Sequence, residues 1–159
     1  MFTTYVRPLL ESNTYVWSPH LLRDIDALEA VQKRFTINIP QLAEKTYLER
    51  LQHLGLTSLE ERCIIFDLTL VYKMFHGLID LKIEDFFTLN QNSTRGHNFK
   101  LNVCYSRVNY RKYFFSNRIV PIWNNLPSDS VNSQSLYAFK KSVNRYSLIS
   151  YCRGHAITT

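Results

Sequence analysis

The segment between Arg95 and Lys141 holds the residues with the most suggestive chemistry, because cations and aromatic rings alternate along it. Arginine binds phosphate oxygens through two parallel hydrogen bonds, and an exposed tyrosine ring stacks on an unpaired base at about 1–3 kcal/mol. This combination predicts a surface that holds nucleic acid by its phosphates and its bases. The residues assigned to that surface are Arg95, Arg107, Tyr110, Arg111, Lys112, Tyr113, Arg118, Lys140 and Lys141.

Large apolar residues in the same segment allow a second interpretation, in which they form a core and the cations simply cover it. We expect both interpretations to hold. The cations named above stay outside for phosphate, and Arg145 extends the surface along the last helix. The core positions are Phe114, Phe115, Ile119 and Trp123.

Charge is divided unevenly along the chain, which has a formal net charge of +6. Residues 1–94 contain nine Lys and Arg against twelve Asp and Glu, whereas residues 95–159 contain ten against one, Asp129. The second part therefore carries a formal charge of +9. Such an imbalance is typical of a surface that binds a polyanion, usually through phosphates. A merely basic surface is the alternative.

Acidic residues are not arranged for metal-dependent catalysis. Asp24 and Asp26 form an Asp-x-Asp motif, but residues i and i+2 of a helix point to different sides and do not share one ion. We expect both to be solvated acids near a helix N-terminus. Two-metal phosphoryl transfer needs clustered carboxylates, and the sequence has no Asp-Asp pair. We therefore expect no catalytic residue and no enzyme activity of the chain's own.

The spacing of cysteine and histidine argues against a metal site. Cys152 and His155 form one close pair, but a structural zinc site needs four ligands, usually two close pairs. Cys104 and His97 are the remaining candidates, and their spacing matches no familiar zinc pattern. His76 is interpreted as a satisfied core or helix-end histidine. The sequence has no Walker loop, dinucleotide fingerprint or nucleophile elbow, so we expect no cofactor and no small-molecule substrate.

The composition is that of an intracellular protein, cytoplasmic or nuclear. No apolar run approaches the ~18 residues of a membrane span, and the first residues lack the basic and apolar regions of a secretory signal. The three cysteines are odd in number and widely spaced, which suits a reducing compartment. We expect neither secretion nor a membrane partner.

Helices should position most of these residues. In the first half, apolar spacing predicts helices over about residues 5–16 and 19–36, the second with Ser18 as its N-cap and Pro19 in its first turn. The stripe expected to face the core of the second helix is Leu21, Ile25, Leu28, Val31 and Phe35.

Two capping boxes, Thr46 with Glu49 and Ser58 with Glu61, begin the next helices. The second opens the strongest helix, about residues 59–76, which is apolar over so wide an arc that it should be the central element of the first core. Its apolar positions are Cys63, Ile64, Phe66, Leu68, Leu70, Val71, Met74 and Phe75.

The second half favours shorter elements. Partial alternation over about residues 99–108 predicts one or two short strands. A helix is expected over about 112–125, kinked or shortened by Pro121, and a last helix over about 134–147 behind a Ser133 cap.

Six stretches carry a further signal because of their order along the chain. They are YVRPLLE (5–11) with VWSP (16–19), DIDALEAVQKRFT (24–36), LGLTSLEER (54–62), VYKMFHGL (71–78), TRGH (94–97) and FFSNRIVPIWNNLP (114–127). Together they resemble the region that follows the polymerase palm in reverse transcriptases of non-LTR retrotransposons, the jockey-like group of LINE elements. One departure is Ile37-Asn38-Ile39, where relatives often carry a basic residue, and it weakens the case for a nucleic-acid contact at that turn.

This resemblance implies that residues 5–80 correspond to the thumb, which grips the template–primer duplex beside the palm. The parent would be an RNA-directed DNA polymerase whose catalytic aspartates lie upstream of this stretch. The expected fold is mainly α, a helical thumb-like bundle followed by a small basic α+β, mostly helical, domain. The expected boundaries are 1–87 for the thumb-like region, 88–98 for a linker, 99–149 for the basic C-terminal domain and 150–159 for a loose tail.

The function that follows is a non-catalytic, nucleic-acid-binding C-terminal fragment of a retrotransposon reverse transcriptase, gripping template–primer or element RNA. Its expected partners are RNA, an RNA–DNA hybrid or DNA, and the polymerase palm of the parent protein. The alternative is a protein-interaction module that packs on that palm and makes little contact with nucleic acid, an idea favoured by the apolar first half.

Overall fold

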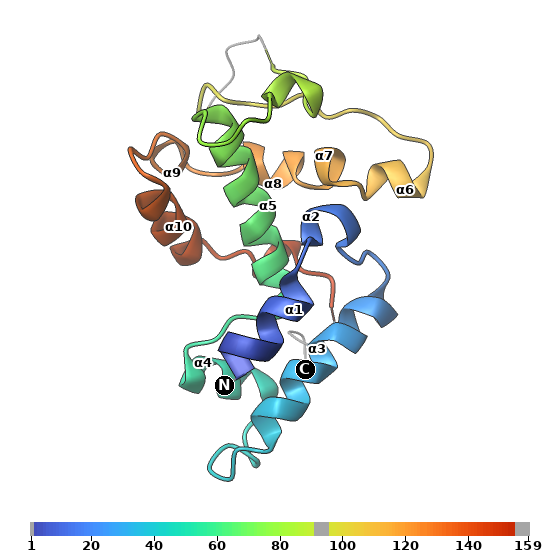
Figure 1. Cartoon of the computed structure of the whole chain (residues 1–159), viewed down its shortest axis with the longest axis vertical. Coiled ribbons are helices and arrows are strands. Elements are labelled where there is room, and N and C mark those ends of the chain that lie inside the picture. The colour runs from blue at the N-terminus through green and yellow to red at the C-terminus, as the bar shows by residue number, and fades with distance from the viewer. Residues whose placement is uncertain (1, 91–95, 155–159) are drawn as a thin grey trace. The chain divides into compact units, whose positions relative to one another are not determined.

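The protein is mainly helical in its computed structural model, which describes residues 2–90 and 96–154. The chain folds into two compact units (Figure 1). The first unit runs up to Ile64 and is completed by the segment from Leu148 onward, and the second runs from Ile65 to Ser147. The mainly α fold class is confirmed. The strands expected over 99–108 are absent from the described residues, which hold one isolated antiparallel bridge between Leu89 and Leu101.

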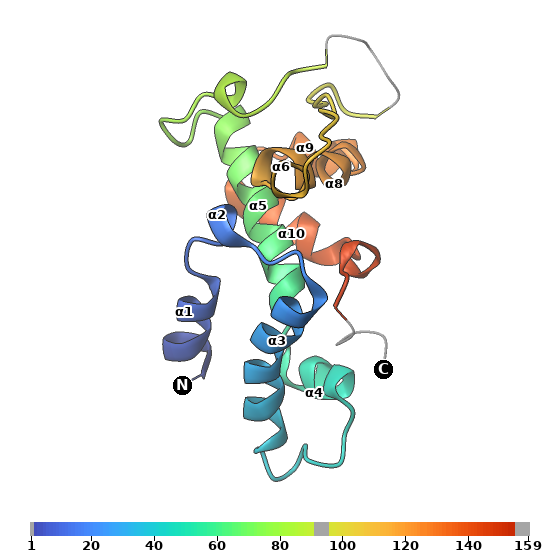
Figure 2. The ribbon, with the colours of Figure 1, turned by 90° about the vertical axis from the view of Figure 1, so that its right-hand side faces the viewer.

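The helices of the first unit are short except for two. Helix α3 is Leu22–Ile37 and helix α5, which begins in this unit, is Leu59–Phe75. The remaining elements are the π-helix η1 (Phe2–Val6), α1 (Arg7–Glu11), α2 (Thr14–Trp17), α4 (Tyr47–Leu54) and the 3₁₀ turn η3 (Ile149–Tyr151). Figures 1 and 2 both show α3 and α4 side by side.

The buried stripe of α3 is mostly polar, which corrects the apolar stripe expected for it except at Ile25. Its buried members are Ile25, Glu29, Gln32 and Thr36, whereas Leu21, Val31 and Phe35 are exposed. The Glu29 carboxylate accepts hydrogen bonds from the Tyr47 hydroxyl and from the Leu59 N–H, the latter at 2.9 Å. Burial raises the pKa of Glu29 above its ordinary value, and these hydrogen bonds oppose that rise. The polar stripe therefore ties α3 to α4 and to the start of α5.

The start of α3 also differs from expectation. Ser18 ends α2, because its N–H bonds the carbonyl of Thr14 at 2.9 Å, and α3 begins at Leu22 without a side-chain cap. The capping box of α4 is confirmed: the Thr46 N–H donates to Glu49 Oε2 at 2.8 Å, and the Glu49 N–H returns a bond to Thr46 Oγ1 at 3.4 Å.

The segment after Leu148 is packed rather than loose as far as residue 154. The Leu148 side chain is fully buried. The Glu60 carboxylate accepts from the N–H groups of Arg153 at 2.7 Å and of Gly154 at 2.8 Å, and Gly154 is buried. Residues 155–159 of the expected tail lie outside the described residues.

The second unit is built on the remaining turns of α5, which ends at Phe75 and is followed by a turn at Gly77 with φ +60°. Its other elements are η2 (Ile83–Asp85), α6 (Asn109–Lys112), α7 (Phe115–Arg118), α8 (Val120–Asn124), α9 (Ser128–Val131) and α10 (Leu136–Arg145). Aromatic rings pack on α5: Tyr72 stacks on Phe139 at 4.2 Å between ring centroids, and Phe75 on Trp123 at 5.4 Å. Helix α5 is expected at the centre of the first core, whereas these contacts place its second half in the core of the second unit.

Two helices of this unit correct the sequence prediction. The helix expected over 112–125 is replaced by two short ones, α7 and α8, which follow α6 because Phe114 is extended (ψ 152°) and Pro121 lies in the first turn of α8. The last helix is capped by Ser135, whose hydroxyl accepts from the Ala138 N–H at 3.2 Å. Ser133, the cap expected from sequence, instead donates its hydroxyl to the Asp129 carbonyl at 3.1 Å.

The division between the units falls within α5 and not at the polar stretch 88–98. Hydrogen bonds join the two ends of that stretch: the Asn90 N–H bonds the Lys100 carbonyl at 2.9 Å, and the Asn102 N–H bonds the Thr88 carbonyl at 2.8 Å. Both flanks therefore belong to the second unit. The apolar length of α5 contributes buried side chains to the core of each unit.

Candidate nucleic-acid interface

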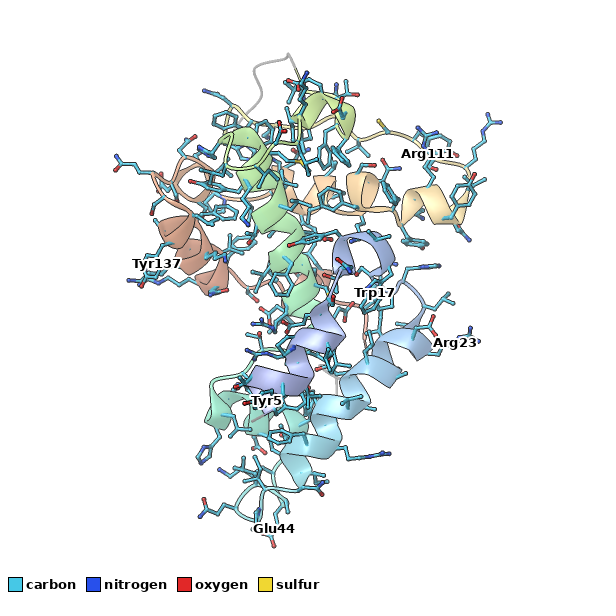
Figure 3. The ribbon with its side chains drawn as sticks, viewed as in Figure 1. Tyr5, Trp17, Arg23, Glu44, Arg111 and Tyr137 are labelled. Carbon is cyan, nitrogen blue, oxygen red and sulfur yellow. The ribbon has the colours of Figure 1, made fainter. Side chains whose placement is uncertain are left out.

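An exposed arm carries most of the predicted nucleic-acid-binding residues. We define the arm as residues 103–112, which include α6. Apart from Ser106, which is half-buried, each of these side chains is exposed. The arm contains Tyr105, Arg107, Tyr110, Arg111 and Lys112, and its sequence holds no acidic residue. Figure 3 shows Arg111 at the outer edge of the second unit, on α6.

The beginning of the arm is fastened by a side-chain amide. The Leu101 N–H donates to Asn124 Oδ1 at 2.9 Å, and Asn124 Nδ2 donates to the Leu101 carbonyl at 2.8 Å. The amide thus pairs with both backbone groups of Leu101, whose side chain is buried. This pairing satisfies the buried backbone of Leu101 and sets the point at which the chain leaves the core.

The end of the arm is fastened by two side chains of α7. Asn117 Nδ2 donates to the Arg111 carbonyl at 2.8 Å, and Arg118 Nη1 donates to the Tyr113 carbonyl at 3.2 Å. The Phe115 ring is buried and meets the ring of Phe87 edge-on at 5.5 Å. The arm is therefore a displayed segment with an anchor at each end.

Arg118 belongs to that anchor rather than to the exposed surface. Its Nε donates to Asp67 Oδ2 at 2.7 Å and its Nη2 to Asp67 Oδ1 at 3.1 Å. Burial raises the pKa of Asp67 to about 6, against the opposing effect of Arg118. The guanidinium that sequence reasoning assigned to phosphate is paired with a carboxylate of α5.

Tyr113 is placed differently from Tyr110. The Tyr113 side chain is half-buried, and Lys112 Nζ lies 5.5 Å from the centre of its ring. The Tyr110 side chain is exposed, and no cation of the described residues lies over its ring. Of these two rings, Tyr110 is the one open to a ligand.

The predicted residues Lys140 and Lys141 form a separate basic face on α10, with Arg145 also exposed. Figure 1 shows α6 and α10 on opposite sides of α5 within the second unit. The structure therefore brings together Arg107, Tyr110, Arg111 and Lys112, but not the two lysines of α10. Arg95 lies outside the described residues.

Three of the histidines and cysteines considered as ligands contact backbone carbonyl oxygens, and Cys104 is an exposed free thiol. His97 is buried with Nε2 3.1 Å from the Trp123 carbonyl oxygen, and burial lowers its pKa. His76 Nε2 lies 3.4 Å from the Val131 carbonyl oxygen, and its ring stacks on Tyr72. Cys152 Sγ lies 3.6 Å from the Leu148 carbonyl oxygen, and burial raises the pKa of that thiol.

Within residues 2–90 and 96–154, no three His, Cys, Asp or Glu side chains gather as a metal site, and His155 lies outside those ranges. Asp24 is exposed and pairs with Arg23 at 3.2 Å, as expected for a solvated acid, whereas Asp26 is half-buried. The described helices are too short or too polar to cross a membrane.

Sequence reasoning missed Tyr105, Asn124 and Asp67. Tyr105 is the most exposed tyrosine of the arm, and the alternating pattern around it predicts a strand instead. Asn124 and Asp67 act on partners 23 and 51 residues away, so local spacing contains no signal for them.

Comparison with family models, with curated proteins and with solved structures finds no match to this chain.

Proposed function

We propose that this protein binds nucleic acid through the cations of its arm, Arg107, Arg111 and Lys112. One observation carries the proposal. These three side chains are exposed, and the described residues offer them no ion-pair partner, whereas Arg118 next to them is held by Asp67. Three unpaired cations on one short segment repel each other unless anions bind there, and closely spaced phosphates are anions of suitable geometry.

We further propose that the chain corresponds to the thumb and C-terminal region of a non-LTR retrotransposon reverse transcriptase, without polymerase or nuclease activity of its own. Support comes from the string 114–127 that carries the resemblance. Its members Asn117, Arg118 and Asn124 fasten the two ends of the arm, so the string has a clear physical role in displaying cations. Such a function belongs in the cytoplasm or nucleus, where RNA and DNA are found.

A charge-matched pair of variants tests nucleic-acid binding. Arg107→Ala with Arg111→Ala and Lys112→Ala removes three cations from the arm. Arg23→Ala with Lys45→Ala and Lys82→Ala removes three exposed cations elsewhere. In fluorescence anisotropy with labelled RNA and DNA, the arm variant should lose at least ~10-fold in affinity, since each charge-assisted contact is worth about 1.5–3 kcal/mol. The control should bind like the wild type. Equal affinities of the two variants would refute the proposal.

An apolar groove on the first unit favours the alternative of a protein-interaction module. It has a volume of about 430 Å³ and lies between η1 and α3, with the exposed side chains of Val31 and Phe35 on its wall. Its occupant in that case would be the polymerase palm of the parent protein. Under this alternative the wild type binds nucleic acid weakly and the arm variant binds no more weakly than the control.

A further inference from the structure

Two tyrosine rings on the arm are available to a ligand. The exposed fraction is 87% for Tyr105 and 80% for Tyr110. Among the described residues neither hydroxyl has a hydrogen-bond partner and neither ring has an aromatic or cationic neighbour, in contrast to Tyr113 beneath Lys112. Both faces of each ring therefore meet solvent, and covering them with a flat apolar surface removes that area from water.

The cations around these rings restrict the kind of surface that covers them. Arg107 lies between the two tyrosines in sequence, and Arg111 follows Tyr110 directly. A flat aromatic group joined to an anion can stack on a tyrosine ring and pair with a neighbouring arginine at the same time. A nucleobase next to its phosphate is such a group, and every base offers a π-face whatever its identity.

The geometry of the arm favours an unpaired strand over a duplex. Helix α6 has four residues, which gives it a length of about 6 Å, too short to lie along a major groove as a recognition helix does. Tyr105 and Tyr110 are five residues apart, which limits the separation of their Cα atoms to about 17 Å, so both rings are within reach of bases of one strand. In a duplex the base faces are already stacked on each other and are closed to both rings.

We propose that Tyr105 and Tyr110 form a base-stacking pair that selects single-stranded nucleic acid over duplex. This inference rests on the proposed function, because the cations supply the attraction for phosphate. The rings add selectivity for a base that is unpaired, and they add it without reading its sequence. Tyr105 was not among the nucleic-acid-binding residues expected from sequence. Tyr113 was among them, but its half-buried ring is not part of the proposed pair.

The test compares three probes of equal length: a single strand of mixed sequence, the corresponding duplex, and a single strand of abasic sites. The single strand is tested both as RNA and as DNA. We expect the two tyrosine rings to increase the affinity for whichever of these nucleic acids binds. Wild type should prefer the base-containing strand over both other probes. Each ring replaced by alanine should cost about 5- to 150-fold in affinity for that strand.

Matched variants separate stacking from other effects. Tyr105→Phe with Tyr110→Phe keeps both rings and should retain the preference, whereas Tyr105→Ala with Tyr110→Ala should bind the base-containing and abasic strands alike and lose the preference over duplex. Tyr5→Ala removes a tyrosine that is 67% exposed in the first unit and should change nothing. The slope of log affinity against log salt should stay the same in the alanine variant, since no phosphate contact is lost.

Equal binding of wild type to the base-containing and abasic strands would overturn the stacking pair, as would wild-type affinity of the double alanine variant. Neither result would contradict phosphate binding by the arm cations, provided that the slope of log affinity against log salt is unchanged. Failure of the proposed function would give a different result. In that case the variant without Arg107, Arg111 and Lys112 would bind every probe as the wild type does.

Discussion

Arg111 and Arg118 carry the same charge in the same segment and serve different ends. The Arg118 side chain is 17% exposed and forms two hydrogen bonds with the buried Asp67 carboxylate. The Arg111 side chain is exposed, and only its backbone carbonyl contributes to the anchor of the arm. The amino-acid composition does not distinguish the two arginines. Burial and ion pairing show that Arg118 has a structural role, whereas Arg111 is available to a ligand.

Replacing each arginine should show this difference in stability. Arg118→Ala leaves a buried carboxylate without its partner, and it should lower the free energy of unfolding by about 3–5 kcal/mol. Arg111→Ala changes an exposed side chain and should stay within about 0.5 kcal/mol. Chemical denaturation of both variants beside the wild type measures the two values. Equal stabilities would mean that Arg118 is not part of the core.

Asp67 should also give the stability of the protein a specific dependence on pH. Burial raises its pKa from 3.8 to about 6 in the folded chain. Between these values the folded state holds a proton that the unfolded state has released, so the contribution of Asp67 is full at low pH and is lost as pH rises through about 6. The free energy of unfolding of wild type, minus that of Asp67→Asn, should therefore fall from pH 4 to pH 7. A difference that stays flat or rises would contradict the burial of this carboxylate.

At the scale of elements, the arm depends on its anchors more than on its own helix. Helix α6 has four residues and no side-chain cap, and such a short helix has no stability of its own in water. The Asn124 amide and the α7 side chains define where the arm leaves and rejoins the core. The exposed position of the arm cations therefore depends on the side chains that anchor the arm and not on helix α6 itself.

Asn124→Ala should loosen the arm at its first anchor. The change leaves the buried N–H and carbonyl of Leu101 without partners, at a cost of about 1–3 kcal/mol. Limited proteolysis with trypsin, which cuts after Lys and Arg, should become faster at Arg107, Arg111 and Lys112. Asn144→Ala, an exposed asparagine of α10, provides the control. Cleavage at the same rate in both variants would show that Asn124 does not hold the arm.

The first unit depends on the segment around Gly154 in a comparable way. A Cβ at Gly154 would lie 2.8 Å from Ile25 Cγ2 and 3.0 Å from Glu60 Oε2. Gly154→Ala should therefore destabilise the first unit by about 1–3 kcal/mol, the range typical of overpacking. Ser150→Ala, at an exposed position of the same segment, should have little effect. If Gly154→Ala had the same melting temperature as the wild type, the segment around Gly154 would not be packed in solution.

Local signals predicted the elements whose determinants are local. The Thr46–Glu49 capping box and the apolar length of α5 were both readable, although Leu68 is fully buried while Leu70 is only half-buried. The polar stripe of α3 was not readable, because Glu29 is satisfied by Tyr47 and Leu59 from other elements. The alternating residues 99–108 suggested strands, but within the described chain they form one isolated bridge at Leu101, with backbone hydrogen bonds at Lys100 and Asn102.

At the scale of the whole molecule, charge was the most informative property of the sequence. The excess of cations after residue 95 pointed to the second unit, which carries the arm and the basic face of α10. Four of the predicted residues, Arg107, Tyr110, Arg111 and Lys112, lie together on the arm. Composition could not separate these from Arg118, since pairing with a residue 51 positions away is decided by the fold.

Salt dependence of binding is the most direct measurement of the central proposal, that the arm cations meet phosphates. Each phosphate contacted releases counterions and contributes about 0.7–0.9 to the slope of log affinity against log salt. Removing Arg107, Arg111 and Lys112 together should therefore make the slope shallower by about 2–3, while circular dichroism shows the fold intact. A variant that keeps both the affinity and the slope of the wild type would contradict the proposal.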